Sequence, residues 1–278
     1  SAGATLKLLF PGSYANFGVD NLTGTITNVG TTSYLNNVEN ATLNIEYSGN
    51  LGNDFTSNQD YFQSLFGGLN GFGFDFGLSY RLTKGNDDNK KNYLINAGFA
   101  MRNVGSMTFK DDNNSSTNYV LNIESTPQNP SGLDLLDYEN VTSLEEIEQK
   151  LLDSGYLTNE KNNNQFKVNL PTTINLYADV KIIHSLFVTL YTQQKVKNDN
   201  DNSQITTQNI LSVTPRLSRD NFELFSTWAT NEISGLSGGL GGRIGGFFIG
   251  SSSIITSSIS NSKQLDFFVG WRMGIGNN

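Results

Sequence analysis

Long segments of this chain alternate regularly between apolar and polar positions. Residues 166–182 carry Phe166, Val168, Leu170, Thr172, Ile174, Leu176, Ala178, Val180 and Ile182 at the even positions. The odd positions between them are mainly polar and include Pro171. A period of two is that of a β-strand, because a helix repeats every 3.6 residues. The segment therefore predicts one long strand, with a bulge or the strand's entry into the sheet at Pro171.

The same alternation recurs along the chain. Clear examples are residues 41–48, 72–82, 93–102 and 265–275, and weaker ones lie near 4–10, 13–20, 118–124, 186–194, 205–217, 222–229 and 236–257. Turns rich in Asn, Asp and Gly separate these segments, as in 84–92, 110–118 and 197–203. The pattern predicts an all-β protein of about 12–14 antiparallel strands.

One segment has a helical pattern. In residues 142–155, TSLEEIEQKLLDSG, the apolar residues Leu144, Ile147 and Leu151 share one helix face. Ser143 and Glu146 have the spacing of a capping box, and Gly155 is a suitable stop. This short helix falls in a long connection, 126–163, and connections of that length are usually functional or mobile. No linker divides the chain, so we expect a single domain, 1–278.

Composition excludes several classes of protein. The chain has 278 residues, no cysteine and a net charge of −8. Disulfide scaffolds, thiolate zinc sites and cysteine nucleophiles are therefore excluded, and no nucleic-acid partner is expected from so acidic a chain. No run of eighteen apolar residues is present, which excludes a transmembrane helix. An aromatic content of 11% argues against disorder.

Three architectures fit strands with two different faces: a water-soluble β domain, a transmembrane barrel and a repetitive fibre. No fixed period supports a fibre. The polar positions are rich in Gly, Asn and Ser with isolated charges, which suits a crowded interior better than open solvent. We therefore predict a closed antiparallel transmembrane β-barrel in a bacterial outer membrane, since strands in hydrocarbon must pair at every edge.

This prediction assigns side chains to two environments. The residues expected to face outer-membrane lipid are Phe72, Phe74, Phe76, Ile174, Leu176, Val180, Val269 and Trp271. The charges expected to form a lumen network are Glu46, Asp75, Arg81, Arg102, Asp179, Lys181, Arg216, Glu223, Arg243, Asp266 and Arg272. Both signs occur in similar numbers, so we expect a lumen filled by ion pairs and not an open channel. Since long loops of such barrels lie outside, the 126–163 loop is expected to be extracellular.

Candidate catalytic and metal sites are weak. His184 is the only histidine and lies in a tight turn, where a structural role is favoured over a lipase-like pair with serine. Asp111–Asp112 and residues 198–201 lack the spacing of a complete calcium loop. The glycines of 235–246 do not match a phosphate-binding motif and indicate bent strands instead. We expect no catalytic residue, no metal and no cofactor.

Several stretches resemble a family of outer-membrane barrel proteins from Bacteroidota. They are GATLKLLFPGSYANFGVDNLTGTIT, FGLSYRL, LPTTINLYADVKI, ILSVTPRLSRDNFELFSTW and the C-terminal residues 239–276. The family looks related to the PorP/SprF barrels of gliding and type IX secretion, and some relatives carry an OmpA-type domain. The resemblance implies an accessory role in a larger envelope machine and offers no catalytic residue. It also implies that an N-terminal part is missing from this chain.

The expected function is that of a non-enzymatic outer-membrane subunit, structural or accessory, in secretion, outer-membrane protein assembly or envelope attachment. Its partners would be outer-membrane lipid and other outer-membrane or periplasmic proteins of a complex. A narrow porin or hydrophobic-solute transporter is the alternative. A membrane-embedded hydrolase is a third class, which the poor placement of His184 disfavours.

Overall fold

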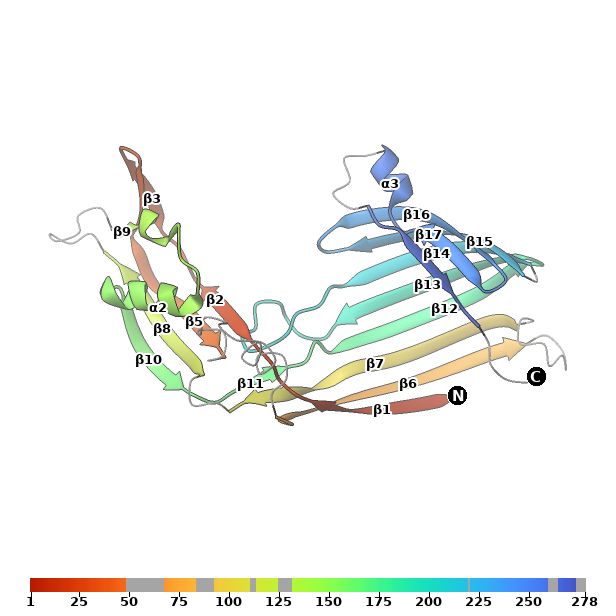
Figure 1. Ribbon diagram of the computed structural model, residues 1–278, viewed down its shortest axis with the longest axis horizontal. Helices are drawn as coiled ribbons and strands as arrows, with labels where there is room; N and C mark the ends of the chain where they lie inside the picture. The colour runs from red at the N-terminus through yellow and green to blue at the C-terminus, as the bar shows by residue number, and fades with distance from the viewer. Residues whose placement is uncertain are drawn as a thin grey trace.

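The part of the protein that the structure describes is all-β apart from three short helical segments, η2 (Leu136–Tyr138), α2 (Leu144–Asp153) and α3 (Ile254–Ile259). The computed structural model describes residues 1–48, 68–83, 93–110, 114–124, 132–219, 221–259 and 265–273. Across these residues, eighteen strands form three antiparallel sheets of eleven, four and three strands (Figure 1). In this part of the chain, no helix is both long enough and apolar enough to cross a membrane.

The large sheet takes up most of the chain. It runs in the order β1-β6-β7-β12-β13-β14-β15-β16-β17-β18, and β11 also pairs with β7. Its strands are β1 (Ala2–Leu9), β6 (Gly71–Thr83), β7 (Tyr93–Phe109), β11 (Phe166–Asn169), β12 (Thr173–Ile183), β13 (Leu186–Lys195), β14 (Ile210–Arg219), β15 (Phe222–Asn231), β16 (Gly235–Ile244), β17 (Phe247–Ser251) and β18 (Phe268–Trp271). The sheet is strongly curved (Figure 1).

The predicted closed barrel of about 12–14 strands is wrong. The large sheet is open: β1 and β18 are its two ends, and neither of the other sheets closes on itself. Alternation fixes which residues share a face, but it does not decide whether the first and last strands meet. Some alternating segments, among them 41–48 and 118–124, belong to the four-stranded sheet and not to the large one. The predicted lumen therefore does not exist in this structure.

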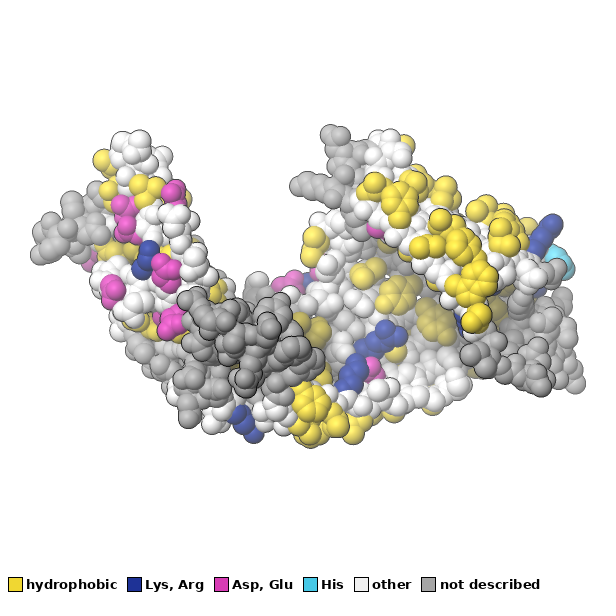
Figure 2. Space-filling view, viewed as in Figure 1, with side chains coloured by type: hydrophobic (Ala, Val, Ile, Leu, Met, Phe, Trp, Pro, Cys, Tyr) yellow, Lys and Arg dark blue, Asp and Glu magenta, His cyan; other side chains and the backbone are white. Residues whose placement is uncertain are grey.

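The two faces of the large sheet differ in polarity. We call the apolar face, on the outside of the curve, the outer face, and the polar face, inside it, the inner face. In Figure 2, apolar side chains gather over β16–β18 and along the lower margin of the sheet. The hollow between these regions is mainly polar and holds basic and acidic side chains. The register explains this division, because residues of one kind lie side by side across strands, as Leu78, Phe99 and Leu176 do.

The remaining strands form a second lobe with its own core. The four-stranded sheet has the order β10-β8-β5-β2, and β3, β4 and β9 form the third sheet. The elements of this lobe are β2 (Ala15–Asp20), β3 (Thr25–Val29), β4 (Thr32–Asn36), β5 (Val38–Tyr47), β8 (Ser115–Ile123), β9 (Leu133–Asp134), the 3₁₀ helix η2 (Leu136–Tyr138), α2 (Leu144–Asp153) and β10 (Leu157–Asn163). We call it the small lobe.

The core of the small lobe is conventional. Leu43 and Ile45 of β5 pack with Tyr119 and Leu121 of β8, and α2 covers them with Leu151. Leu43 is 2% exposed and Ile45 is fully buried. The apolar edge of residues 41–48 therefore packs against protein, unlike the apolar edges of the strands in the large sheet. The helix explains the difference, because its own apolar face needs a partner.

The predicted helix is confirmed. Helix α2 begins after Ser143, whose side chain accepts a hydrogen bond from the Glu146 N–H at 3.1 Å. The Glu146 carboxylate in turn accepts from the Thr142 N–H at 3.0 Å, and this bond lowers the pKa of Glu146 below its ordinary value. Gly155 follows the helix with a φ of 76°. The described part of the 126–163 connection is thus mostly regular, because it contains β9, η2, α2 and β10.

The long strand predicted over 166–182 is interrupted. It consists of β11 and β12, which are separated by residues 170–172 and both pair with β7. Pro171 lies in the gap, so the proline marks a break between two strands where a bulge or the start of one strand was predicted. Strand β7 has its own irregularity at this point, because Arg102 and Asn103 together oppose Asp75 of β6. Asn103 has a φ of 57°, and the local shift is a β-bulge.

Candidate functional site: the inner face of the large sheet

The outer face consists of uncovered apolar side chains. All eight residues that were assigned to lipid lie in strands of the large sheet on this face. Among them, Phe72 is 58% exposed, Leu176 46% and Trp271 68%, while Ile174 and Val180 are half-buried. The facing predicted from alternation agrees with this register. Lipid contact itself stays a prediction.

The inner face carries linked ion pairs on four strands, and a hydrogen bond extends them to a fifth. Arg216 of β14 contacts Asp179 of β12 at 2.5 Å and Glu223 of β15 at 3.3 Å. Arg243 of β16 contacts the same Glu223 at 3.2 Å, and the Tyr93 hydroxyl of β7 donates to Asp179. Asp179 is only 8% exposed. Glu223 and Arg243 are directly opposite each other in the register, and Arg216 reaches its two carboxylates diagonally. These charges neutralise one another at positions where little water could solvate them.

Two other predicted charges on this face lie over aromatic rings. The Arg81 guanidinium is 5.6 Å from the centre of the Tyr93 ring, and the Lys181 ammonium is 5.8 Å from the centre of the Phe187 ring. These cation–π contacts place both charges beside the network. The inner face therefore brings together Arg81, Asp179, Lys181, Arg216, Glu223 and Arg243.

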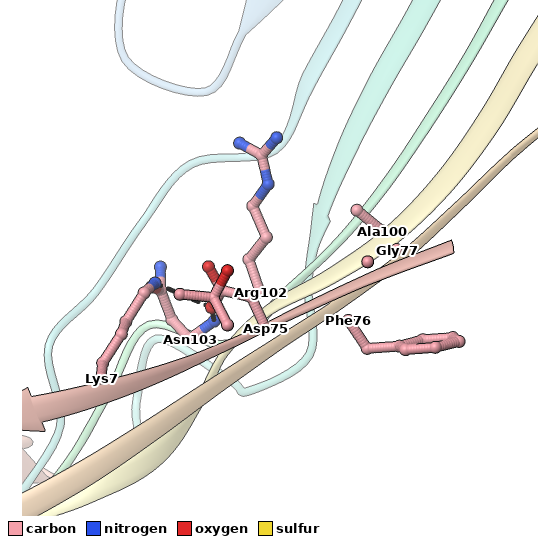
Figure 3. Close-up of a pocket in the computed structure, with 9 residues that line it drawn as sticks. Lys7, Asp75, Phe76, Gly77, Ala100, Arg102 and Asn103 are labelled. Carbon is pink, nitrogen blue, oxygen red and sulfur yellow. Dashed lines mark hydrogen bonds and ion pairs between the residues drawn. The ribbon is translucent and has the colours of Figure 1, made fainter. Parts of the chain in front are cut away.

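A second polar group lies at the β1 end of the inner face. The Lys7 ammonium contacts Asp75 Oδ1 at 2.7 Å and Asn103 Oδ1 at 2.6 Å. The Asn103 backbone N–H also donates to Asp75, at 2.8 Å. Beside this group is an open hollow of about 410 Å³, which is lined by Gly3, Thr5, Lys7, Asp75, Phe76, Gly77, Ala100, Arg102 and Asn103. Figure 3 shows Lys7, Asp75 and Arg102 on one side of the sheet and Phe76 on the other.

Three predicted network members lie elsewhere. Glu46 belongs to β5 of the small lobe, where its carboxylate accepts hydrogen bonds from Ser116 and Ser203 at 2.9 and 2.7 Å. Asp266 precedes β18 and accepts from the Ser252 N–H at 3.0 Å. Arg272 follows β18 and is exposed. Each lay in an alternating segment, but Glu46 belongs to another sheet, and Asp266 and Arg272 lie just outside the two ends of β18.

The Glu46 contact joins the two lobes. Ser203 lies in the connection between β13 and β14, and its carbonyl accepts from the Asn169 N–H of β11 at 2.9 Å. Asn202 of the same connection accepts from Asn16 of β2 at 3.1 Å. The small lobe is thus bound by polar contacts to the connection between β13 and β14, and Tyr14, just before β2, also packs against Phe109 and Phe166 of the large sheet.

Sequence reasoning missed Lys7 and Asn103 and did not place Tyr93 in the network. Lys7 is the one charged residue in the stretch TLKLLF and alternates with Leu6 and Leu8, which could have indicated that it lies on the polar face. Asn103 acts through the left-handed conformation of its backbone at the bulge, and strand periodicity carries no signal for that. Alternation assigns Tyr93 to the apolar face, yet its hydroxyl reaches Asp179 on the inner face.

The weaker candidates lie at the surface. His184 is exposed in the turn between β12 and β13. Asp199 forms an ion pair with Lys195 and is not free for calcium. Over the described ranges, which exclude Asp111 and Asp112, no group of three acidic or histidine side chains is placed to hold a metal ion. The glycines of 235–246 lie in β16 and its turn to β17, as the strand interpretation predicted.

Comparison with known proteins gives a family and no activity. A family model described as "Family of unknown function (DUF5723)" matches residues 1–252. The searches of curated proteins and of solved structures found no match.

Proposed function

The chain belongs to DUF5723, a family of unknown function, and from its two-faced sheet we propose that it is a non-enzymatic accessory subunit of a bacterial outer-membrane complex. In this role the outer face of the large sheet lies against lipid. The small lobe has a buried apolar core like that of a water-soluble domain, and it lies outside the hydrocarbon. The choice of the outer membrane rests on the strand pattern and on the resemblance to outer-membrane proteins.

The observation that carries the proposal is the uncovered outer face. Exposed apolar residues occur on strands from one end of the large sheet to the other, including Leu6, Phe74, Leu190, Leu224 and Val269. Soluble monomers rarely expose a contiguous apolar patch of more than a few hundred Å². A sheet with this face needs an apolar medium or an apolar partner along its whole width.

The inner face supports the same orientation. In a soluble sandwich the buried face of a sheet is apolar. Here the more enclosed face carries Asp179, Arg216 and Glu223, which are bound to one another, and the apolar face is the open one. Engagement of these charges with each other also favours a structural role for them over catalysis.

The open edges support a role as a subunit. An unpaired backbone N–H or C=O costs several kcal/mol in hydrocarbon, so a sheet edge in lipid needs another strand beside it. Strand β1 is eight residues long, contains no proline, and is unpaired on one side within the described structure. A partner that supplies such a strand would complete the sheet, which is the reason for proposing an accessory subunit.

A pair of adjacent substitutions tests the lipid contact. Val213 lies on the outer face of β14 and is 38% exposed, whereas Ser212 lies on the inner face. We expect Val213→Arg to destabilise the lipid-inserted protein by about 2–4 kcal/mol and Ser212→Arg by less than about 1 kcal/mol. The measurement is flotation with phosphatidylcholine vesicles, followed by urea titration of the bound fraction.

Two outcomes contradict the proposal. One is a chain that is monodisperse in plain buffer and stays at the bottom of the flotation gradient. The other is equal tolerance of both arginines in vesicles. A large steady conductance across planar bilayers would favour the alternative of a narrow porin over an accessory subunit.

A further inference from the structure

The hollow beside Lys7 is built by a row of very small residues. Gly3 of β1 is paired with Gly77 of β6, which is paired with Ala100 of β7. A Cβ at Gly3 would meet no atom within 4 Å. Other glycines of the inner face are covered, Gly98 by the Tyr177 ring and Gly73 by the Leu170 side chain. The space over Gly3, Gly77 and Ala100 is therefore open, because no large side chain projects into it.

The charged rim of the hollow is held in place. Lys7 and Asp75 bind each other, and Asn103 binds both groups, through its side chain to Lys7 and its N–H to Asp75. The Thr172 hydroxyl donates to the Asn103 carbonyl at 2.8 Å, which holds the bulge against the next strand. This triad is internally satisfied and contributes no net charge.

Arg102 is different. The bulge sets it next to Asn103 on the inner face, and its side chain rises from the sheet beside the triad (Figure 3). Across the described ranges, no hydrogen bond or salt bridge joins its guanidinium to another residue, although its charge acts on Asp75. The other arginines of the inner face, Arg81, Arg216 and Arg243, each contact a ring or a carboxylate.

We propose that this hollow is a binding site for a small oxyanion, a carboxylate or phosphate group, held by Arg102 over the floor of Gly3, Gly77 and Ala100. Two cations and one carboxylate line the site, so one positive charge is left over. A guanidinium fork binds a carboxylate or a phosphate through two parallel N–H bonds. The small floor residues let such a group approach the sheet without a steric clash.

The volume and the lining narrow the ligand class. A hollow of about 410 Å³ accepts a small organic anion with room for water. Thr5 and Asp75 can bind hydroxyl or amine groups of the same ligand. A metal cation is disfavoured, because Lys7 already occupies the Asp75 oxygen that faces it. This inference does not depend on the proposed function, since it concerns only the inner face.

Protection of single arginines from phenylglyoxal tests the site. The full chain in detergent is treated with the reagent, alone and with inorganic phosphate or acetate, against chloride at equal ionic strength. Peptide mass spectrometry then gives the modification rate of each arginine. We expect either anion to slow the reaction of Arg102 by about threefold or more, because a bound fork is shielded.

Arg81 is the matched control, since it is an exposed arginine on the same face, and its rate should not change. In Gly3→Val, a side chain fills the hollow without a backbone clash, and protection of Arg102 should be lost. Protection by only one of the two anions supports the site and identifies its class. Equal rates at Arg102 with and without both anions, or equal protection of Arg81, would overturn the proposal.

Discussion

At the scale of single residues, the inner face depends on mutual neutralisation. Arg216 lies between Asp179 and Glu223, and its guanidinium is also 4.8 Å from the centre of the Phe187 ring. Asp179 lies between Arg216 and the Tyr93 hydroxyl. Taking away one partner leaves a largely buried charge without compensation, which costs more than the pair contributes.

A double-mutant cycle measures this dependence. We expect Arg216→Gln to destabilise the protein by about 3 kcal/mol, because Asp179 remains charged, and Arg81→Gln by less than about 1 kcal/mol. Adding Asp179→Asn to Arg216→Gln should recover part of the loss. Urea denaturation in detergent gives the free energies of unfolding of the unmodified protein, of Arg216→Gln, Asp179→Asn and their double variant, and of the Arg81→Gln control. Strictly additive single effects would show that the two groups are not coupled.

Sequence reasoning identified Asp179, Arg216, Glu223 and Arg243 because alternation alone places them on one face. It did not find the Lys7–Asp75–Asn103 group as a unit. That group depends on a bulge, which shifts the register by one residue and cannot be deduced from a period of two. Single-residue irregularities are therefore what the sequence predicts least well, and here they form the candidate ligand site.

At the scale of elements, similar patterns have opposite fates. Residues 41–48 and 72–82 alternate equally well, yet Ile45 is fully buried and Phe72 is 58% exposed. The sequence signal that could have separated the two segments was the amphipathic helix 142–155. Its apolar face needs a protein surface to cover, and in the structure it covers β5 and β8. Most strands, the faces of their residues and the capped helix were predictable, but the predicted strand segment near 236–257 ends in helix α3 (Ile254–Ile259). Sheet membership was not, because it depends on pairing between segments far apart in the chain.

Alanine substitutions at two glycines with positive φ distinguish the conformational cost of a side chain from its steric cost. Gly155 after α2 has a φ of 76°, and a Cβ added there would have no atom within 4 Å. At Gly105 in β7, with a φ of 155°, a Cβ would be 2.1 Å from the Phe72 carbonyl oxygen. We expect Gly155→Ala to cost about 1 kcal/mol. Gly105→Ala should cost about 3 kcal/mol or prevent folding of the large sheet. Urea denaturation measures both, and equal losses would contradict the register at Gly105.

At the scale of the whole molecule, the open edge of β1 is the feature that alternation could not predict. Ser1 and Ser79 exchange two backbone hydrogen bonds of 2.8 Å. Because bonded and non-bonded pairs alternate in an antiparallel ladder, Gly3, Thr5 and Lys7 also bond to β6. The backbone groups that point to the free edge are those of Ala2, Ala4, Leu6 and Leu8.

Proline at Ala4 tests whether this edge pairs with a partner strand. Ala4→Pro removes an outward N–H and keeps every bond between β1 and β6. We expect it to lower co-purification of envelope proteins from detergent extracts by about tenfold, while the yield of folded chain is unchanged. Ala4→Val keeps the N–H and should behave as the unmodified chain. Equal recovery of partners with both variants would exclude this edge as the contact.

The interleaving of the two lobes along the chain has a consequence for assembly. Strands β2–β5 of the small lobe lie between β1 and β6, and β8–β10 lie between β7 and β12. If the small lobe folds first in water, it brings the ends of β1, β6, β7 and β12 together before the apolar strands pair. Loop closure costs less entropy when a connection is shortened in this way. The small lobe is thus suited to nucleate folding of the large sheet, because it is formed by the connections between β1 and β6 and between β7 and β12.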